Sequence, residues 1–240
     1  MSDSLITSDT FKEITHKIES YLNLKELITE NEYLEIAGDS FKFVGLLRNI
    51  SSLASRKKFE CFLKSFKDVE TPTQVQLKKL VDYIDDEYKA EFISSTFNKV
   101  LTSNSSKCCL IMGSIFQKII DKKDRLSHNE LVCIDALTSF FDVDITNFKF
   151  LYSYILNSKN KTLIISKKFE SYCHELNMDI DSITLTIEKL VSHQLLFKDS
   201  DSELDIDEDN ISFADVDTYD FYKVTPPGLM LNKFIQNLNL

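Results

Sequence analysis

Residues that break helices are scarce in this chain. Only 4 glycines and 3 prolines occur among its 240 residues. Folds rich in β-strands need many tight turns, and those turns draw on glycine and proline. The chain is therefore predicted to be mainly α-helical, with short loops between helices. Apolar residues at helical spacing support this prediction, as in "SSLASRKKFECFLKSFK", where Leu53, Phe59, Phe62 and Leu63 share one face.

The apolar pattern divides the chain into an N-terminal helix (1–30), a helical bundle (31–158) and a C-terminal domain (159–240). Within the bundle, "KCCLIMGSIFQKII" is apolar on more than one face, which predicts a central helix. "SHNE" at 127–130 has the spacing of a capping box and predicts a helix start. The carboxylate pairs Asp85/Asp86 and Asp142/Asp144 are predicted to lie at helix N-termini.

The character of the sequence changes near residue 159. β-Branched residues at 162–165 predict a short strand, and Ser166 and Asp179 are predicted to cap two successive helices. Asn177 stands between those helices, where left-handed backbone is expected. "QLLFK" and "FYKVT" predict two paired strands, and "PPGLMLNKFIQNL" predicts a closing helix.

This order of elements resembles the winged-helix domain of bacterial regulators. "HELNMDIDSITLTIEKLVSHQLL" is similar to the second and third helices and first wing strand of that family, and "YKVTPPGLMLNKFI" resembles the returning strand and its Thr-Pro-x-Gly turn. The resemblance implies a winged-helix-like domain packed on the bundle. The sequence departs from the family at His193, where a glycine commonly precedes the wing strand, and in an insertion at 199–220 that makes the wing long. Residues 31–158 loosely resemble helical domains of uncharacterised prophage and mobile-element proteins.

The insertion at 199–220 carries the whole net charge of the protein. The chain has 38 acidic and 28 basic residues, a net charge of −10, and removing 199–220 leaves 28 of each. We expect this acidic wing to be a solvated loop. As a partner-binding segment it would present Asp199, Asp201, Glu203, Asp205, Asp207, Glu208, Asp209, Asp215, Asp217 and Asp220. It would mimic DNA toward a nucleic-acid-binding partner, or fold on a basic one.

A calcium site in the wing is not predicted. Asp205, Asp207 and Asp209 alternate like the first ligands of an EF-hand loop, with Asn210 at the turn position. The twelfth position is Val216, whereas calcium loops need a bidentate glutamate there. The sequence therefore predicts no metal site.

A second charged surface is basic. Its residues are Arg56, Lys57, Lys58, Lys64 and Lys67. A solvated helix face explains this cluster, and docking of an acidic partner, of nucleic acid or of the protein's own wing is the functional alternative. A contact between the wing and this basic face would weaken with salt.

No pattern of residues indicates catalysis or a cofactor. Glycines at 38, 45, 113 and 228 cannot form a phosphate-binding loop, and no CxxC, HExxH or GxSxG occurs. Cys173 and His174 are adjacent, so on a helix they point apart. The odd cysteine count and the lack of a secretion signal predict reduced thiols and a cytoplasmic protein. No window is apolar enough to span a bilayer. The protein is predicted not to be an enzyme.

The predicted third helix of the winged-helix-like domain lacks the positive charge of a DNA-recognition helix. Its expected outward positions are Asp181, Ser182, Thr184, Thr186, Glu188 and Lys189. Carboxylates here and in the wing would repel a phosphate backbone. We therefore predict a non-enzymatic interaction or regulatory protein of a prophage or phage-defence locus, whose winged helix contacts protein. Two alternatives stay open: a DNA-binding regulator whose dimer gathers positive charge around 56–67, and an acidic inhibitor that mimics DNA. A homodimer also stays open.

Overall fold

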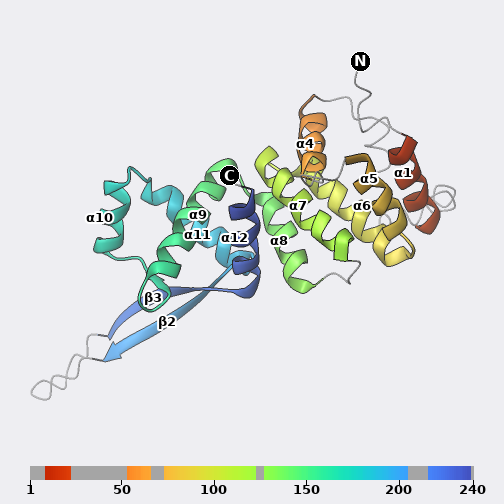
Figure 1. The fold of residues 1–240 in the computed structure, drawn as a ribbon. Coiled ribbons are helices and arrows are strands. Elements are labelled where there is room, and N and C mark those ends of the chain that lie inside the picture. Colours follow the sequence, from red (N-terminus) through yellow and green to blue (C-terminus); the bar gives the residue numbers. More distant parts are fainter. Residues whose placement is uncertain (1–8, 23–52, 66–72, 123–126, 205–215, 239–240) are drawn as a thin grey trace, which may run out of the picture. The chain divides into compact units, whose positions relative to one another are not determined.

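Helices make up most of the protein in the computed structural model (Figure 1). The structure describes residues 9–22, 53–65, 73–122, 127–204 and 216–238. Within these ranges the chain forms ten helices and one small antiparallel sheet of three strands. The prediction of a mainly helical protein is confirmed. The first residues of the predicted bundle, 31–52, lie outside the described residues.

The first part of the chain is entirely helical where it is described. Its helices are α1 (Asp9–Tyr21), α4 (Leu53–Lys64), α5 (Thr73–Tyr83), α6 (Glu87–Thr102), α7 (Ser106–Lys122) and α8 (His128–Ser139). The break between α5 and α6 falls at Ile84–Asp86, where the apolar pattern weakens, and Asp86 caps α6 by accepting a hydrogen bond from the Lys89 backbone N–H. The predicted capping box of Ser127 and Glu130 at the start of α8 is confirmed.

Helix α7 is the centre of this part, as its apolar sequence predicts. It packs against α4, α5 and α8. Gly113 allows the close approach of α4, because a Cβ atom there would collide with the Ser65 hydroxyl and the Phe62 carbonyl. The core around this contact is aromatic: the Phe59 and Phe97 rings meet edge to face at 5.1 Å, and Phe116 adds a ring from α7.

The second part mixes helices with the sheet. Its elements are α9 (Asp142–Asn157), β1 (Thr162–Ile164), α10 (Lys167–Glu175), α11 (Ile180–Ser192), β2 (Leu196–Leu204), β3 (Val216–Val224) and α12 (Pro226–Asn237). The strands are all antiparallel in the order β1-β3-β2, with Tyr222 of β3 opposite both Leu163 and Lys198. The predicted caps Ser166 and Asp179 are confirmed, and Asn177 has the expected positive φ of 53°.

The contacts within the chain separate these two parts between Phe141 and Asp142. Helix α9 packs against α11, α12, β1 and β3 and so belongs to the second unit. The boundary expected at 158/159 differs from this division, because "DVDITNFKFLYSYIL" reads as one more bundle helix when its partners are unknown. Helix α1 likewise packs on α5 and α6, so the expected segment 1–30 is not separate from the first unit where it is described.

The turn before α12 is anchored on α9. The Tyr152 hydroxyl donates a hydrogen bond to the Leu195 carbonyl, and Gly228 lies directly against that hydroxyl. Thr225 caps α12 by accepting from the Gly228 N–H, while its own hydroxyl lies 2.8 Å from the Leu195 carbonyl. These contacts fix where β2 begins and where β3 ends.

Candidate functional site

Much of the acidic segment is strand rather than loop. Strands β2 and β3 extend to Leu204 and from Val216, so residues 199–204 and 216–220 belong to a long hairpin. The prediction that all of 199–220 is a solvated loop is wrong for these residues. The remaining predicted carboxylates lie outside the described residues: Asp205, Asp207, Glu208, Asp209 and Asp215. The same holds for the three aspartates of the rejected calcium motif.

Two lysines, one on β2 and one on β3, form ion pairs with aspartates of the hairpin near the start of β2 and the end of β3. The Lys198 ammonium lies 2.6 Å from Asp220, and the Lys223 ammonium lies 3.9 Å from Asp199. The hydrogen bond from Lys198 holds the pKa of Asp220 below its usual value and raises the pKa of Lys198. All four side chains are about half exposed, so each pair contributes little to stability. Asp199 and Asp220 therefore each lie beside a lysine at the start of β2 and near the end of β3.

The single lysine of α11 does not face outward. Its ammonium group lies 2.6 Å from the carboxylate of Asp144 on α9, whose side chain is only 3% exposed. Thr186 is buried and donates a hydrogen bond to the same carboxylate. The prediction that Thr186 and Lys189 are outward positions is wrong, because a buried carboxylate needs a cation and donors. Asp144 does lie in the first turn of α9, but its carboxylate joins two helices.

Further polar contacts join α9 and α11 beside this ion pair. The Asn147 side-chain amide lies 3.0 Å from both the Ser182 and Thr186 hydroxyls. Ser182, also predicted to face outward, is thus partly engaged with α9. What α11 exposes is different: Asp181 and Glu188 are exposed, and Leu185 between them is 60% exposed. The outer face of α11 is acidic and apolar.

The basic face on α4 is smaller than its sequence indicates. Arg56 forms an ion pair with Glu60 of the same helix at 3.1 Å, and the Lys58 ammonium donates to the Leu101 carbonyl at the end of α6. Lys57 and Lys64 are exposed, two helical turns apart. Lys67 lies outside the described residues. Of the five predicted residues, two therefore present charge to solvent without a competing contact among the described residues.

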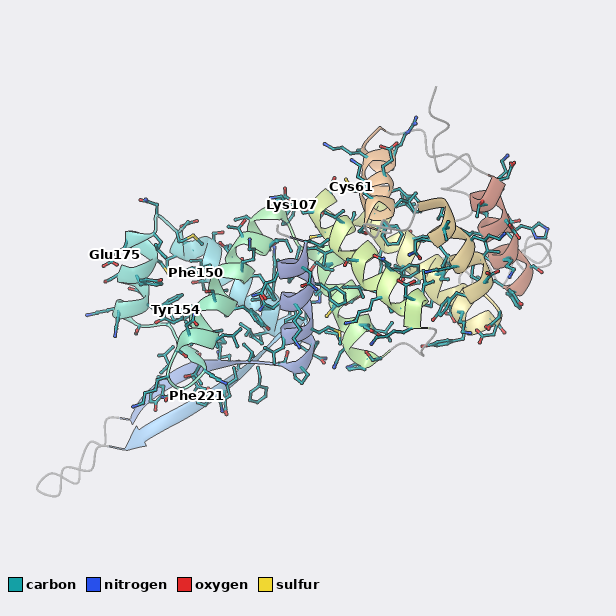
Figure 2. All side chains as sticks on the ribbon, in the orientation of Figure 1. Cys61, Lys107, Phe150, Tyr154, Glu175 and Phe221 are labelled. Carbon is teal, nitrogen blue, oxygen red and sulfur yellow. The ribbon has the colours of Figure 1, made fainter. Side chains whose placement is uncertain are left out.

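A groove between α9 and α10 was missed by the sequence reasoning. It has a volume of about 450 Å³ and is lined by Phe150, Ser153, Tyr154, Asn157, Ser158, Lys159, Lys168 and Tyr172. Phe150 and Tyr154 stand one turn apart on α9 (Figure 2), and both rings contact Tyr172 of α10, at 6.0 and 5.6 Å between centroids. The groove thus combines half-exposed aromatic rings with two lysines.

The sequence does hold a signal for this groove. Between residues 145 and 169 there are five lysines and no carboxylate, in a chain whose net charge is negative. "FKFLYSY" within that stretch interleaves aromatic rings with lysine, a pattern typical of surfaces that bind nucleic acids or nucleotides.

A second pocket, in the first unit, has both of its lysines in ion pairs. It has a volume of about 400 Å³ and contains two ion pairs, Lys79–Asp121 at 2.8 Å and Lys89–Asp85 at 2.5 Å. Burial raises the pKa of the neighbouring Tyr83 to about 12. No group of three or more His, Cys, Asp or Glu side chains within the described residues is arranged to hold a metal ion.

The cysteines are free thiols. Cys108, Cys109, Cys133 and Cys173 are buried, and Cys61 is half-buried. Burial raises the pKa of the Cys109 thiol to about 11 and also raises that of Cys173. Thiols of this kind are packing groups rather than nucleophiles.

Among the helices described here, none combines the length and the apolar character that crossing a bilayer requires. Comparison with models of protein families, with curated proteins and with solved structures gave no match.

Proposed function

We propose that this chain is a non-enzymatic interaction or regulatory protein whose second unit is a winged helix that contacts protein. The order of its elements supports a winged helix: a helix, an edge strand, two further helices, and a hairpin whose returning strand pairs with the edge strand. In that fold the third helix, here α11, and the wing, here the β2–β3 hairpin, form the contact surface of DNA-binding members.

One observation carries the choice of protein over duplex DNA. Lys189, the only Lys or Arg of α11, is bound to the buried Asp144. The exposed face of α11 therefore presents Asp181, Leu185 and Glu188. Affinity for duplex DNA comes mainly from cations at phosphates, and these carboxylates would oppose it. An exposed leucine between two carboxylates fits a protein partner with an apolar pocket rimmed by basic residues.

The test compares capture of partners from the native host by three forms of the full-length protein. Leu185→Glu places a charge at the proposed centre of the contact, and Val75→Glu makes the same change at a 46% exposed residue of α5. The proposal predicts a partner that the wild type and Val75→Glu capture and Leu185→Glu does not. A partner set unaffected by Leu185→Glu would remove α11 as the contact surface.

The alternative of a dimeric DNA-binding regulator is tested by duplex binding over a salt series. Phosphate contacts make affinity fall steeply as salt rises. The proposal predicts no duplex binding even at low salt. Salt-dependent binding that is weakened by Lys57→Glu and Lys64→Glu would favour the regulator, because these two lysines are the exposed cations of α4 that form no ion pair within the described residues.

The hairpin supports a second candidate function, an inhibitor that mimics DNA. Asp199, Asp201 and Glu203 occupy alternate positions of β2, and Asp217 is the register partner of Glu203. Alternate residues of a strand are about 6.6–6.8 Å apart, so the strand forms a regular row of acidic positions. Here the partner is a nucleic-acid-binding enzyme. Duplex DNA would then compete for the captured partner, whereas it would not compete for a partner held by Leu185.

A cytoplasmic location and a prophage or phage-defence origin complete the proposal. Five free cysteines support a reducing compartment. The origin is supported by the loose resemblance of the helical bundle alone. Fractionation of the native host tests the location.

A further inference from the structure

The groove between α9 and α10 has two chemically different ends. Its apolar end is made of the Phe150, Tyr154 and Tyr172 rings, and Tyr172 is 42% exposed. The buried Phe169 packs against this cluster, with its ring 5.1 Å from the Tyr154 ring in an edge-to-face contact. A ring cluster fixed in this way offers a rigid stacking surface.

The other end is cationic. Lys159 follows the C-terminus of α9 and Lys168 lies in the first turn of α10. Both side chains are exposed, and neither ammonium group has an ion-pair or hydrogen-bond partner among the described residues. No carboxylate lines the groove. The pocket of the first unit differs in this respect, because each of its lysines is bound to an aspartate.

Polar groups lie between the two ends. Ser153 and Asn157 line the groove one turn apart on α9, and their side chains have no hydrogen-bond partner among the described residues. A volume of about 450 Å³ is within the range of small-ligand sites, roughly 300–1,000 Å³. The groove therefore fits a ligand with a planar ring, a polar middle and an anionic group.

We propose that the α9/α10 groove binds a nucleotide unit. The base stacks on Tyr172 and Phe150, the sugar meets Ser153 and Asn157, and the phosphate is held by Lys159 and Lys168. Bases stack on aromatic side chains regardless of sequence, and lysine ammonium groups bind phosphate as point charges. The unit is a free mononucleotide or one nucleotide of a single-stranded chain. Duplex DNA does not qualify, because its bases are already stacked and paired. This site does not depend on the proposed role of α11.

Calorimetry on the full-length protein gives the first measurement. The probes are AMP and UMP. Adenosine, which lacks the phosphate, and ribose 5-phosphate, which lacks the base, are the truncated ligands. A parallel arm measures the anisotropy of a short fluorescein-labelled oligo(dT). The groove predicts that AMP and UMP bind and that each truncated ligand binds more weakly. Affinity for oligo(dT) well above that for the mononucleotides would identify single-stranded nucleic acid as the source, and the reverse would identify free nucleotides.

Variants locate the binding in the groove. Tyr172→Leu removes the stacking ring, and its expected loss of affinity is about 5- to 150-fold. Tyr88→Leu, at a 55% exposed tyrosine of α6, is the matched control and should leave affinity unchanged. Lys159→Gln with Lys168→Gln should abolish mononucleotide binding and reduce the salt slope for oligo(dT) by about 0.7, since the two lysines hold one phosphate and each phosphate contact on a single strand contributes about 0.7. Lys167→Gln, at the neighbouring exposed lysine that does not line the groove, is the control for charge.

Two results would overturn the proposal. The first is no heat and no anisotropy change with ligand in large excess at low salt. The second is binding that Tyr172→Leu and the double lysine variant leave at the wild-type level, because the ligand would then lie elsewhere. Circular dichroism of each variant shows whether a lost affinity reflects a lost fold, and all three substituted side chains, Lys159, Lys168 and Tyr172, are exposed.

Discussion

The salt bridge between Lys189 and Asp144 makes a quantitative prediction about the second unit. Lys189→Met keeps the length of the side chain and its tendency to form helix, and it removes the ammonium group 2.6 Å from the carboxylate. Breaking a fully buried ion pair costs about 3–5 kcal/mol. The Lys189 side chain is 33% exposed, so water reaches one partner and the expected loss of stability is lower, about 2–3 kcal/mol.

Thiol labelling measures this loss in the second unit alone. Cys173 on α10 is completely buried, so a thiol reagent modifies it only when the second unit opens. A loss of about 2–3 kcal/mol should accelerate its native-state labelling about 30- to 150-fold, followed residue by residue with mass spectrometry. Lys233→Met is the matched control on α12, an exposed lysine whose substitution should change stability by less than about 0.5 kcal/mol.

The double variant separates loss of the pair from loss of packing. Asp144→Asn removes the buried charge, so adding it to Lys189→Met should recover about half or more of the stability lost. If Cys173 were labelled at the same rate in Lys189→Met as in Lys233→Met, the ion pair would not stabilise the second unit and the prediction would be wrong. Losses that simply add in the double variant would also refute it, because the two groups would then not interact.

Three further predictions concern single sites. Gly228→Ala should lower stability by about 2–3 kcal/mol, seen as a lower melting temperature, because the new methyl group collides with the Tyr152 hydroxyl. Burial raises the pKa of Tyr83 from 10.0 to about 12, so the stability that Tyr83 contributes should be constant below about pH 10 and be lost as the pH rises toward 12. Denaturant titrations should therefore show a smaller fall in the free energy of unfolding between pH 10 and 12 for Tyr83→Phe than for the wild type. A thiol reagent should modify the half-buried Cys61 in the native protein and reach Cys109, whose pKa burial raises to about 11, only on unfolding.

Local signals in the sequence predicted the helices well. The capping residues Ser127, Ser166 and Asp179 each act within three residues of their own position, so their role needs no knowledge of the fold. The left-handed Asn177 is a local feature of the same kind. The sequence of α7 is apolar on more than one face and likewise predicts a central position, since each apolar face must find a partner.

The errors arose where a residue's role depends on a distant partner. The α11 lysine and Asp144 are 45 positions apart, and no helical pattern shows that they meet. Lys58 was expected to face solvent, but its ammonium donates to a carbonyl 43 positions away. The hairpin strands extend into the acidic segment because antiparallel pairing tolerates charged residues where strands face solvent. The α9/α10 groove was missed for the same reason, since its rings come from two helices.

Photocrosslinking from α11 tests the central claim most directly. Leu185 is replaced by p-benzoylphenylalanine in the full-length protein, expressed in the native host and irradiated, with Val75 replaced in the same way as the control. A protein contact through α11 predicts an adduct at position 185 that proteases digest, that nucleases leave intact and that Glu188→Lys weakens. An adduct that nucleases remove would show nucleic acid at this helix and contradict the account.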